Sequence, residues 1–112
     1  MINITIYRTY DGYKGFEISG HSGYSEAGSD IVCSAVSSIA NSTVVGLCEV
    51  LNIPASVKID EKKGYLKCTL PKVIDDKKAL SAQTLIATMQ KSLEYIQKDY
   101  KKYVKLEVKN EI

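Results

Sequence analysis

The 112-residue sequence has no tryptophan, one histidine and two prolines, and its only arginine is Arg8. Arginine forks are the usual means of gripping phosphates and bases, so their scarcity argues against a nucleic-acid partner. No run reaches the roughly 18 apolar residues of a membrane helix. The N-terminus also lacks the basic start and apolar core of a signal peptide. Three cysteines are an odd count for a disulfide framework. We therefore expect a cytoplasmic protein with reduced thiols and no membrane partner.

What the sequence does contain is enough apolar material, 45% of its residues, for one hydrophobic core. We expect a single domain over residues 1–112. The net charge of +2 conceals an asymmetry, because residues 57–112 carry thirteen lysines against eight acidic residues. This basic half leaves open a non-enzymatic ribosome- or RNA-associated binding module. The lysines are spread over several predicted elements, however, and a solvated surface explains that distribution more simply.

The spacing of apolar residues predicts five strands and two helices. Alternating residues predict a hairpin before Gly20, a second hairpin over 57–61 and 65–70, and a last strand over 104–108. Helical spacing predicts helices over 30–51 and 79–101. The first of these is apolar nearly all round from residue 44 to 51, so we expect it to be buried on several sides, either within the chain or partly by another subunit. The order ββαββαβ predicts an α+β fold, with two helices packed on a mixed, mostly antiparallel sheet.

The candidate chemistry lies between the second strand and the first helix. His21 stands where the strand runs into a glycine-rich loop, and Cys33 lies in the first turn of the helix. Unpaired N–H groups and the positive dipole end of a helix stabilise a thiolate, and a nearby imidazolium adds to this. A thiolate of this kind attacks carbonyl carbons while histidine transfers the proton, and the exposed N–H groups could stabilise the oxyanion.

The alternative is that these cysteines only pack, as free cysteines often do. Cys48 and Cys68 lie in apolar patterns and are predicted to be packing residues. A metal site is not favoured, because Cys33 and Cys48 would stand roughly 22 Å apart on one helix. There is no Cys-x-x-Cys pair either. We expect no cofactor and no metal.

Further residues could support the site. Asp30 could cap the helix or orient His21, and Ser37 follows Cys33 by one helical turn on a polar stripe that continues to Asn41. The loop contains Gly20, Gly23 and Gly28. These glycines would let the loop open and close over the thiol, although a plain surface loop explains them equally well.

The segments Gly20-His21 and Gly28-Ser29-Asp30-Ile31-Val32-Cys33-Ser34-Ala35-Val36-Ser37 resemble the ribosomal-processing cysteine protease Prp family, also called the YsxB-like family. The resemblance extends over essentially the whole chain in length and element order. It implies a homodimeric cysteine endopeptidase that removes the N-terminal extension of a large-subunit ribosomal protein.

The resemblance also implies residue roles. Cys33 corresponds to the nucleophile and His21 to the base, Asp30 and Ser37 to supporting positions, and Gly20 with the following loop to a mobile gate. We expect the acidic residues Asp11, Glu17, Glu26 and Asp30 to surround the site and to attract a basic substrate.

Overall fold

The computed structural model describes residues 1–26 and 30–111. Two β-hairpins, two helices and a final strand follow one another in the predicted order. Their bounds are β1 Ile2–Thr9, β2 Gly12–Ser19, α1 Ile31–Val45, η1 Gly46–Val50, β3 Ser56–Asp60, β4 Tyr65–Thr69, α2 Asp76–Asp99 and β5 Val104–Asn110. The five strands form one sheet in the order β3-β4-β2-β1-β5. Only the β1–β5 pair is parallel, so the predicted α+β class and mixed sheet are confirmed.

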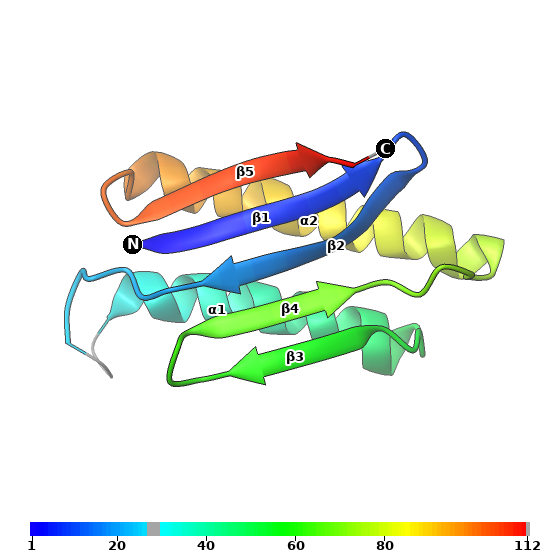
Figure 1. Ribbon diagram of the computed structural model, residues 1–112, viewed down its shortest axis with the longest axis horizontal. Coiled ribbons are helices and arrows are strands. Elements are labelled where there is room, and N and C mark those ends of the chain that lie inside the picture. Colours follow the sequence, from blue (N-terminus) through cyan, green and yellow to red (C-terminus); the bar gives the residue numbers. More distant parts are fainter. Residues whose placement is uncertain (27–29, 112) are drawn as a thin grey trace.

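The molecule has two layers, with α1 and α2 together behind the sheet (Figure 1). The end of β2, the start of α1 and the turn between β3 and β4 all lie at one end of the sheet (Figure 1). The β1–β2 turn and the start of α2 lie at the opposite end (Figure 1). Residues that are distant in sequence are therefore gathered at two separate ends of the molecule.

The alternation along β1 decides which face of the sheet is covered. Ile2, Ile4 and Ile6 are buried, because every second side chain points to the helices. Phe16 and Ile18 of β2 lie on the same side and are also buried. The polar residues between them lie on the other face, which the helices leave uncovered.

The second helix, α2, starts earlier than the apolar stripe alone predicted. Asp75 caps it by accepting a hydrogen bond from the backbone N–H of Lys77, so polar residues from Asp76 onward form its first turn. Its buried stripe is Ala82, Ile86, Met89 and Leu93.

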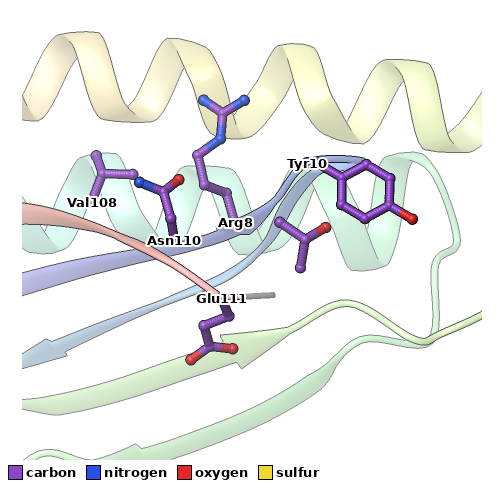
Figure 2. A pocket seen from close by; sticks show the side chains of 6 residues that line it. Arg8, Tyr10, Val108, Asn110 and Glu111 are labelled. Carbon is purple, nitrogen blue, oxygen red and sulfur yellow. The ribbon is translucent and has the colours of Figure 1, made fainter.

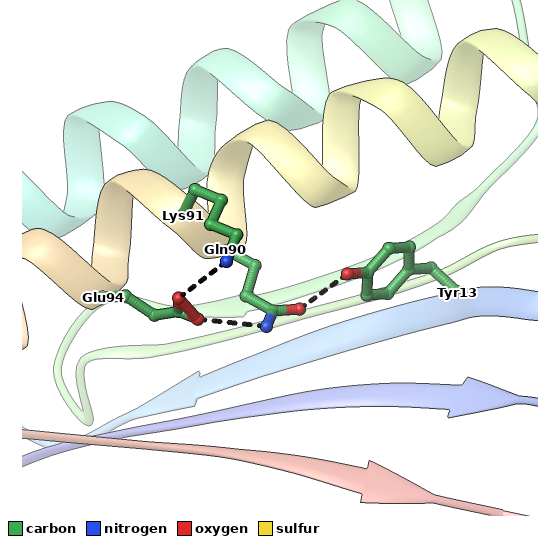
Figure 3. A network of polar contacts seen from close by, with 4 residues as sticks. All are labelled: Tyr13, Gln90, Lys91 and Glu94. Atoms are coloured by element: carbon green, nitrogen blue, oxygen red, sulfur yellow. Dashed lines mark hydrogen bonds and ion pairs between the residues drawn. The ribbon is translucent and has the colours of Figure 1, made fainter.

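A polar chain ties α2 to the sheet (Figure 3). The Tyr13 hydroxyl of β2 donates to Gln90 Oε1 at 2.8 Å. Gln90 Nε2 in turn donates to Glu94, which also forms an ion pair with Lys91 (Figure 3). These bonds fix the helix against β2.

The first helix, α1, begins where it was expected but changes geometry before its end. The α-helix stops at Val45 and continues as a π-helical segment, η1, to Val50. Within the single chain this end is not buried on all sides, since Val45 and Val50 are 45% and 72% exposed, so burial of these two residues would require a second subunit. Leu47 alone in η1 is fully buried. The segment Ile31–Val50 is long and apolar enough to span a membrane by length and composition, but here Val32, Val36 and Ala40 pack in the core of the domain.

Candidate active site

Asp30 organises the start of α1. Its Oδ1 accepts hydrogen bonds from the N–H groups of Val32 and Cys33, both at 3.0 Å, so the predicted N-cap is confirmed. Its other oxygen, Oδ2, accepts a hydrogen bond from the buried hydroxyl of Ser22. Burial of the carboxyl acts to raise the pKa of Asp30, but the hydrogen bonds from Ser22, Cys33 and Val32 outweigh it and hold that pKa below its usual value. Asp30 is therefore an anion that links the loop to the helix.

This capping also changes how the thiol is surrounded. Because the N–H groups of Val32 and Cys33 already donate to Asp30, they are not the unpaired donors that the sequence led us to expect. The N–H group that reaches the thiol comes from the loop instead, since Ser22 N donates to Cys33 Sγ at 3.3 Å. A donor in this position stabilises negative charge on or next to the sulfur.

Two further contacts hold the loop in place. The Ser22 hydroxyl accepts a hydrogen bond from the N–H of Tyr24 at 3.0 Å. The ring of Tyr24 packs edge-on against Tyr100 and Tyr103, with centroid distances of 5.8 and 5.2 Å. The part of the loop that carries His21 is thus anchored on both the α1 side and the α2 side.

His21 is exposed, and its ring contacts the turn between β3 and β4. Nε2 lies 3.1 Å from the carbonyl oxygen of Lys62. The backbone of the same turn is joined to the end of β2, because Gly20 N donates to Lys63 O at 3.3 Å. In this arrangement Asp30 caps the helix and binds Ser22, while the hydrogen bond of the imidazole goes to Lys62.

His21 and Cys33 line one cavity of about 590 Å³. Gly20, Asp30 and Ser37 line it as well, and Ser34 and Asn41 continue the polar stripe of α1 along it. Its apolar wall comes from both layers and consists of Ile2, Ile18, Val36, Ala40, Ile59 and Leu66. A thiol, an imidazole and an apolar wall thus line one cavity, and its volume is sufficient for a peptide segment.

Gly23, another of the predicted loop glycines, is not among the residues that line this cavity. Gly23 adopts a positive φ of 74°, and a Cβ there would meet nothing within 4 Å, so its role is to allow the loop conformation. Gly28 lies outside the described residues.

Sequence reasoning missed two parts of the site. Ser22 received no role from the sequence, whereas in the structure it is 3% exposed and bonds to both Asp30 and Cys33. The β3–β4 turn was treated only as a hairpin closure, and its Lys62 carbonyl contacts His21 from 41 positions away. No local pattern reports such a contact, although a serine beside a candidate histidine could have marked Ser22.

The prediction that four acidic residues surround the site is wrong in part. Asp11 belongs to the β1–β2 turn at the opposite end of the sheet (Figure 1). The Glu17 carboxylate accepts hydrogen bonds from Tyr65 and Tyr7, and these bonds, with that from Tyr65 the strongest, lower the pKa of Glu17. An acid that was not considered, Glu61 of the β3–β4 turn, lines the cavity instead.

The remaining cysteines behave as packing residues, as predicted. Cys68 is 1% exposed, and burial, followed by the proximity of Cys48, raises its pKa to about 11. A thiol in that environment stays protonated and unreactive. Within residues 1–26 and 30–111, no group of three or more histidine, cysteine or acidic side chains could hold a metal ion.

A second cavity, of about 440 Å³, lies near the C-terminal end of β5 (Figure 2). It is lined by Arg8, Thr9, Tyr10, Val108, Asn110 and Glu111. This lining contains neither a thiol nor an imidazole, so the cavity of Cys33 is the better candidate for thiol chemistry.

Comparison with known proteins agrees with this assignment. The family model described as cysteine protease Prp matches residues 1–105. The ribosomal processing cysteine protease Prp of Bacillus subtilis (strain 168) is 35% identical over 102 residues, which cover 90% of this chain and 91% of the relative. SMU.848 from Streptococcus mutans shares the fold with a TM-score of 0.85 and 28% identity, over 99% of this chain and 96% of that protein.

A more distant solved structure shows the same fold. It is the essential ribosomal processing protease Prp from S. aureus with a covalently linked product peptide. It aligns with a TM-score of 0.86 and 24% identity, over 97% of this chain and all of that chain. Fold, cavity and comparisons together define a cysteine protease. The chain belongs to the cysteine protease Prp family.

Proposed function

We propose that this protein removes the N-terminal extension of a large-subunit ribosomal protein, with Cys33 as nucleophile and His21 as general base. The observation that carries the proposal is that both residues line one cavity while the peptide N–H next to His21 donates to Cys33 Sγ. The name of the Bacillus subtilis relative supports the ribosomal substrate. The S. aureus protease has been solved with a substrate peptide and with a covalently linked product peptide, which supports a peptide substrate.

The reaction proceeds in two steps. The imidazole of His21 takes the thiol proton, and Cys33 Sγ bonds to the carbonyl carbon of the scissile peptide. The Ser22 N–H turns from the sulfur to the developing oxyanion. The C–N bond then breaks as the imidazolium returns its proton to the leaving amine. Water, deprotonated by the same imidazole, hydrolyses the thioester and releases the other product with the thiol restored.

The cavity favours an apolar residue near the scissile bond. Its wall of isoleucine, valine and leucine side chains excludes water from a bound apolar side chain. Glu61 at its rim suits a basic residue elsewhere in the same peptide. Both features fit the N-terminal tail of a ribosomal protein, which is usually basic.

The same proposal includes a homodimer that works in the cytoplasm. The exposed apolar residues at the end of α1, Val45 and Val50, support a surface that a second copy covers. Nucleophilic cysteine requires a reduced thiol, which the cytoplasm maintains. Light scattering of the purified chain, with Val50→Lys as the disrupting variant, tests the dimer.

The test of the reaction is cleavage of a synthetic peptide that carries the N-terminal extension of the organism's own ribosomal protein. Cys33→Ala should reduce the rate by at least about a thousandfold, because the nucleophile is lost. Mass spectrometry of quenched wild-type reactions should detect the acyl group on the peptide containing Cys33.

The matched control is Cys48→Ala. Cys48 is also half-buried but does not line the cavity, so this variant should retain wild-type cleavage. Cleavage that survives Cys33→Ala, or an acyl group found on another cysteine, would contradict the proposed nucleophile. A wild-type protein that leaves the extension intact while cutting other peptides would contradict the substrate.

A further inference from the structure

The contact between His21 and the β3–β4 turn determines where the imidazole carries its proton. A carbonyl oxygen accepts hydrogen bonds and never donates them. His21 Nε2 lies 3.1 Å from the carbonyl oxygen of Lys62, so Nε2 must be the protonated nitrogen for this contact to be a hydrogen bond. The neutral ring is then left with its lone pair on Nδ1.

Nδ1 is the ring nitrogen nearer the main chain. The main chain of the next residue, Ser22, contacts the thiol of Cys33. The next peptide N–H, that of Ser22, donates to Cys33 Sγ at 3.3 Å. With Nε2 bonded to the turn, Nδ1 is the ring nitrogen left to act as a base in the cavity that His21 shares with Cys33. Nε2 alone would be the basic atom if the tautomer were reversed.

The turn is shaped for close contact with this histidine. Gly64 adopts a φ of +60°, in the left-handed region that favours glycine. A Cβ at Gly64 would lie 3.1 Å from His21 Cε1 and would overlap the carbonyl oxygen of Gly20. The Gly20 N–H also donates to the Lys63 carbonyl. Three consecutive residues of the turn, Lys62, Lys63 and Gly64, thus touch the two residues at the end of β2.

We propose that the β3–β4 turn is the positioning element of the catalytic histidine: the Lys62 carbonyl holds His21 as the Nε2–H tautomer, and Gly64 allows the turn to approach closely enough to do so. Lys62 then acts through its backbone, in the role that a side-chain acceptor has in other nucleophile–histidine pairs. The inference about the base rests on the proposed function, whereas the tautomer is a property of the resting protein.

The first experiment is a long-range ¹H–¹⁵N correlation spectrum of the ¹⁵N-labelled protein, recorded at a pH where the imidazole is neutral. The chain has one histidine, so the ring signals need no assignment. We expect the pattern of a protonated Nε2 and an unprotonated Nδ1. A protonated Nδ1, or the averaged pattern of a freely exchanging ring, would overturn the proposal.

The second experiment separates steric contact from backbone strain with Gly64→Asn. Asparagine adopts a φ of +60° more readily than most other residues that carry a Cβ. It still places a Cβ against His21 and Gly20. The matched control is Gly12→Ala, which introduces a Cβ at a strained φ of +124° and against the Gln83 side chain, at the opposite end of the sheet.

For Gly64→Asn we expect the Nε2–H pattern to give way to an averaged one, with kcat reduced at least about tenfold, a part of what a general base contributes. Gly12→Ala should keep both the tautomer and kcat, even if its melting temperature falls. An unchanged tautomer in folded Gly64→Asn would overturn the role of the turn, whatever happens to kcat. If Gly64→Asn does not fold, the wild-type spectrum still decides the tautomer, and the same variant refolded at reduced temperature in a stabilising osmolyte decides the role of the turn.

The two proposals fail in different ways. If Cys33→Ala still cleaves peptide, the proposed reaction is wrong, and the tautomer measurement is unaffected by that result. If the wild-type ring is protonated on Nδ1 while Cys33→Ala is inactive, the nucleophile stands and the positioning role of Lys62 is rejected.

Discussion

The two ends of the sheet use the same local device for different purposes. At one end Gly12 has a positive φ and lies against the Gln83 side chain. At the other end Gly64 has a positive φ and lies against His21. In both places a glycine in a hairpin allows a polar side chain from elsewhere in the chain to approach the backbone closely.

The difference lies in how completely the polar groups are satisfied. Gln83 closes its end by accepting from Tyr13 N and donating to Tyr13 O, and nothing reactive is left open there. At the other end His21 uses one ring nitrogen on Lys62 and remains exposed, and Cys33 remains half-buried in a cavity. The two hydrogen bonds between Gln83 and Tyr13 stabilise the fold. The second ring nitrogen of His21, by contrast, remains available to exchange a proton in the cavity that contains Cys33.

Among the variants that compare the two ends of the sheet, His21→Ala should have the largest effect, and it should act on activity alone. The side chain is exposed, so the free energy of unfolding should change by less than about 0.5 kcal/mol. Loss of the base should lower kcat/KM by at least about a hundredfold. Peptide cleavage and urea unfolding of the same preparation measure the two quantities. A variant that loses stability but retains cleavage would show that His21 serves the fold and not the reaction.

Asp30→Ala should affect both activity and stability, because Asp30 joins the loop to the helix. It removes the cap of α1 and leaves the buried Ser22 hydroxyl without its acceptor. We expect a loss of about 2 to 3 kcal/mol in unfolding free energy, from the cap and the unsatisfied hydroxyl together. Asp30→Asn is the control that keeps an acceptor oxygen, and it should recover part of the loss. Equal destabilisation by both variants would mean that the charge, and not the capping geometry, is what matters.

Gln83→Ala tests the closed end of the comparison. The variant removes both hydrogen bonds to Tyr13, and we expect about 1 to 2 kcal/mol less stability. Cleavage by the folded protein should stay within about twofold of wild type, since Gln83 does not line the cavity. A tenfold fall in kcat without a change in stability would show that the two ends are coupled.

Lowering the pH should produce the smallest effect, a decrease in the free energy of unfolding, because Asp30 is stabilised as a carboxylate in the folded protein. Its pKa is lowered in the folded protein, so folding favours the carboxylate. This contribution to stability is present above the ordinary carboxyl value of about 3.9 and is lost as the pH falls through the lower folded value. The free energy of unfolding, measured with urea, should therefore fall less between pH 6 and pH 3 for Asp30→Asn than for wild type. We expect the two falls to differ by about 1 kcal/mol or less. Parallel pH curves for the two proteins would show that Asp30 is not a source of the acid sensitivity.

The secondary structure, with His21 just after a strand and Cys33 in the first turn of a helix, could be read from the sequence because it depends on local pattern. Apolar alternation in Ile2, Ile4 and Ile6 determined a strand with one buried face. The spacing of Ala82, Ile86, Met89 and Leu93 determined a helix with one buried stripe. An aspartate three residues before a cysteine, at the start of an apolar helix, already marked Asp30 as a cap and Cys33 as a residue of the first turn.

What surrounds the reactive pair was decided only by tertiary structure. Ser22 was visible in the sequence, but its bonds to Asp30 and Cys33 depend on how the loop folds back onto α1. The exposure of Val45 and Val50 depends on which neighbours reach the end of the helix. The contact of His21 with Lys62 joins residues 41 positions apart. It exists because β2 pairs with β4, so that the end of one strand meets the turn that begins the other. Local propensity encodes the elements, while the strand pairing brings their ends together, and the site lies where those ends meet.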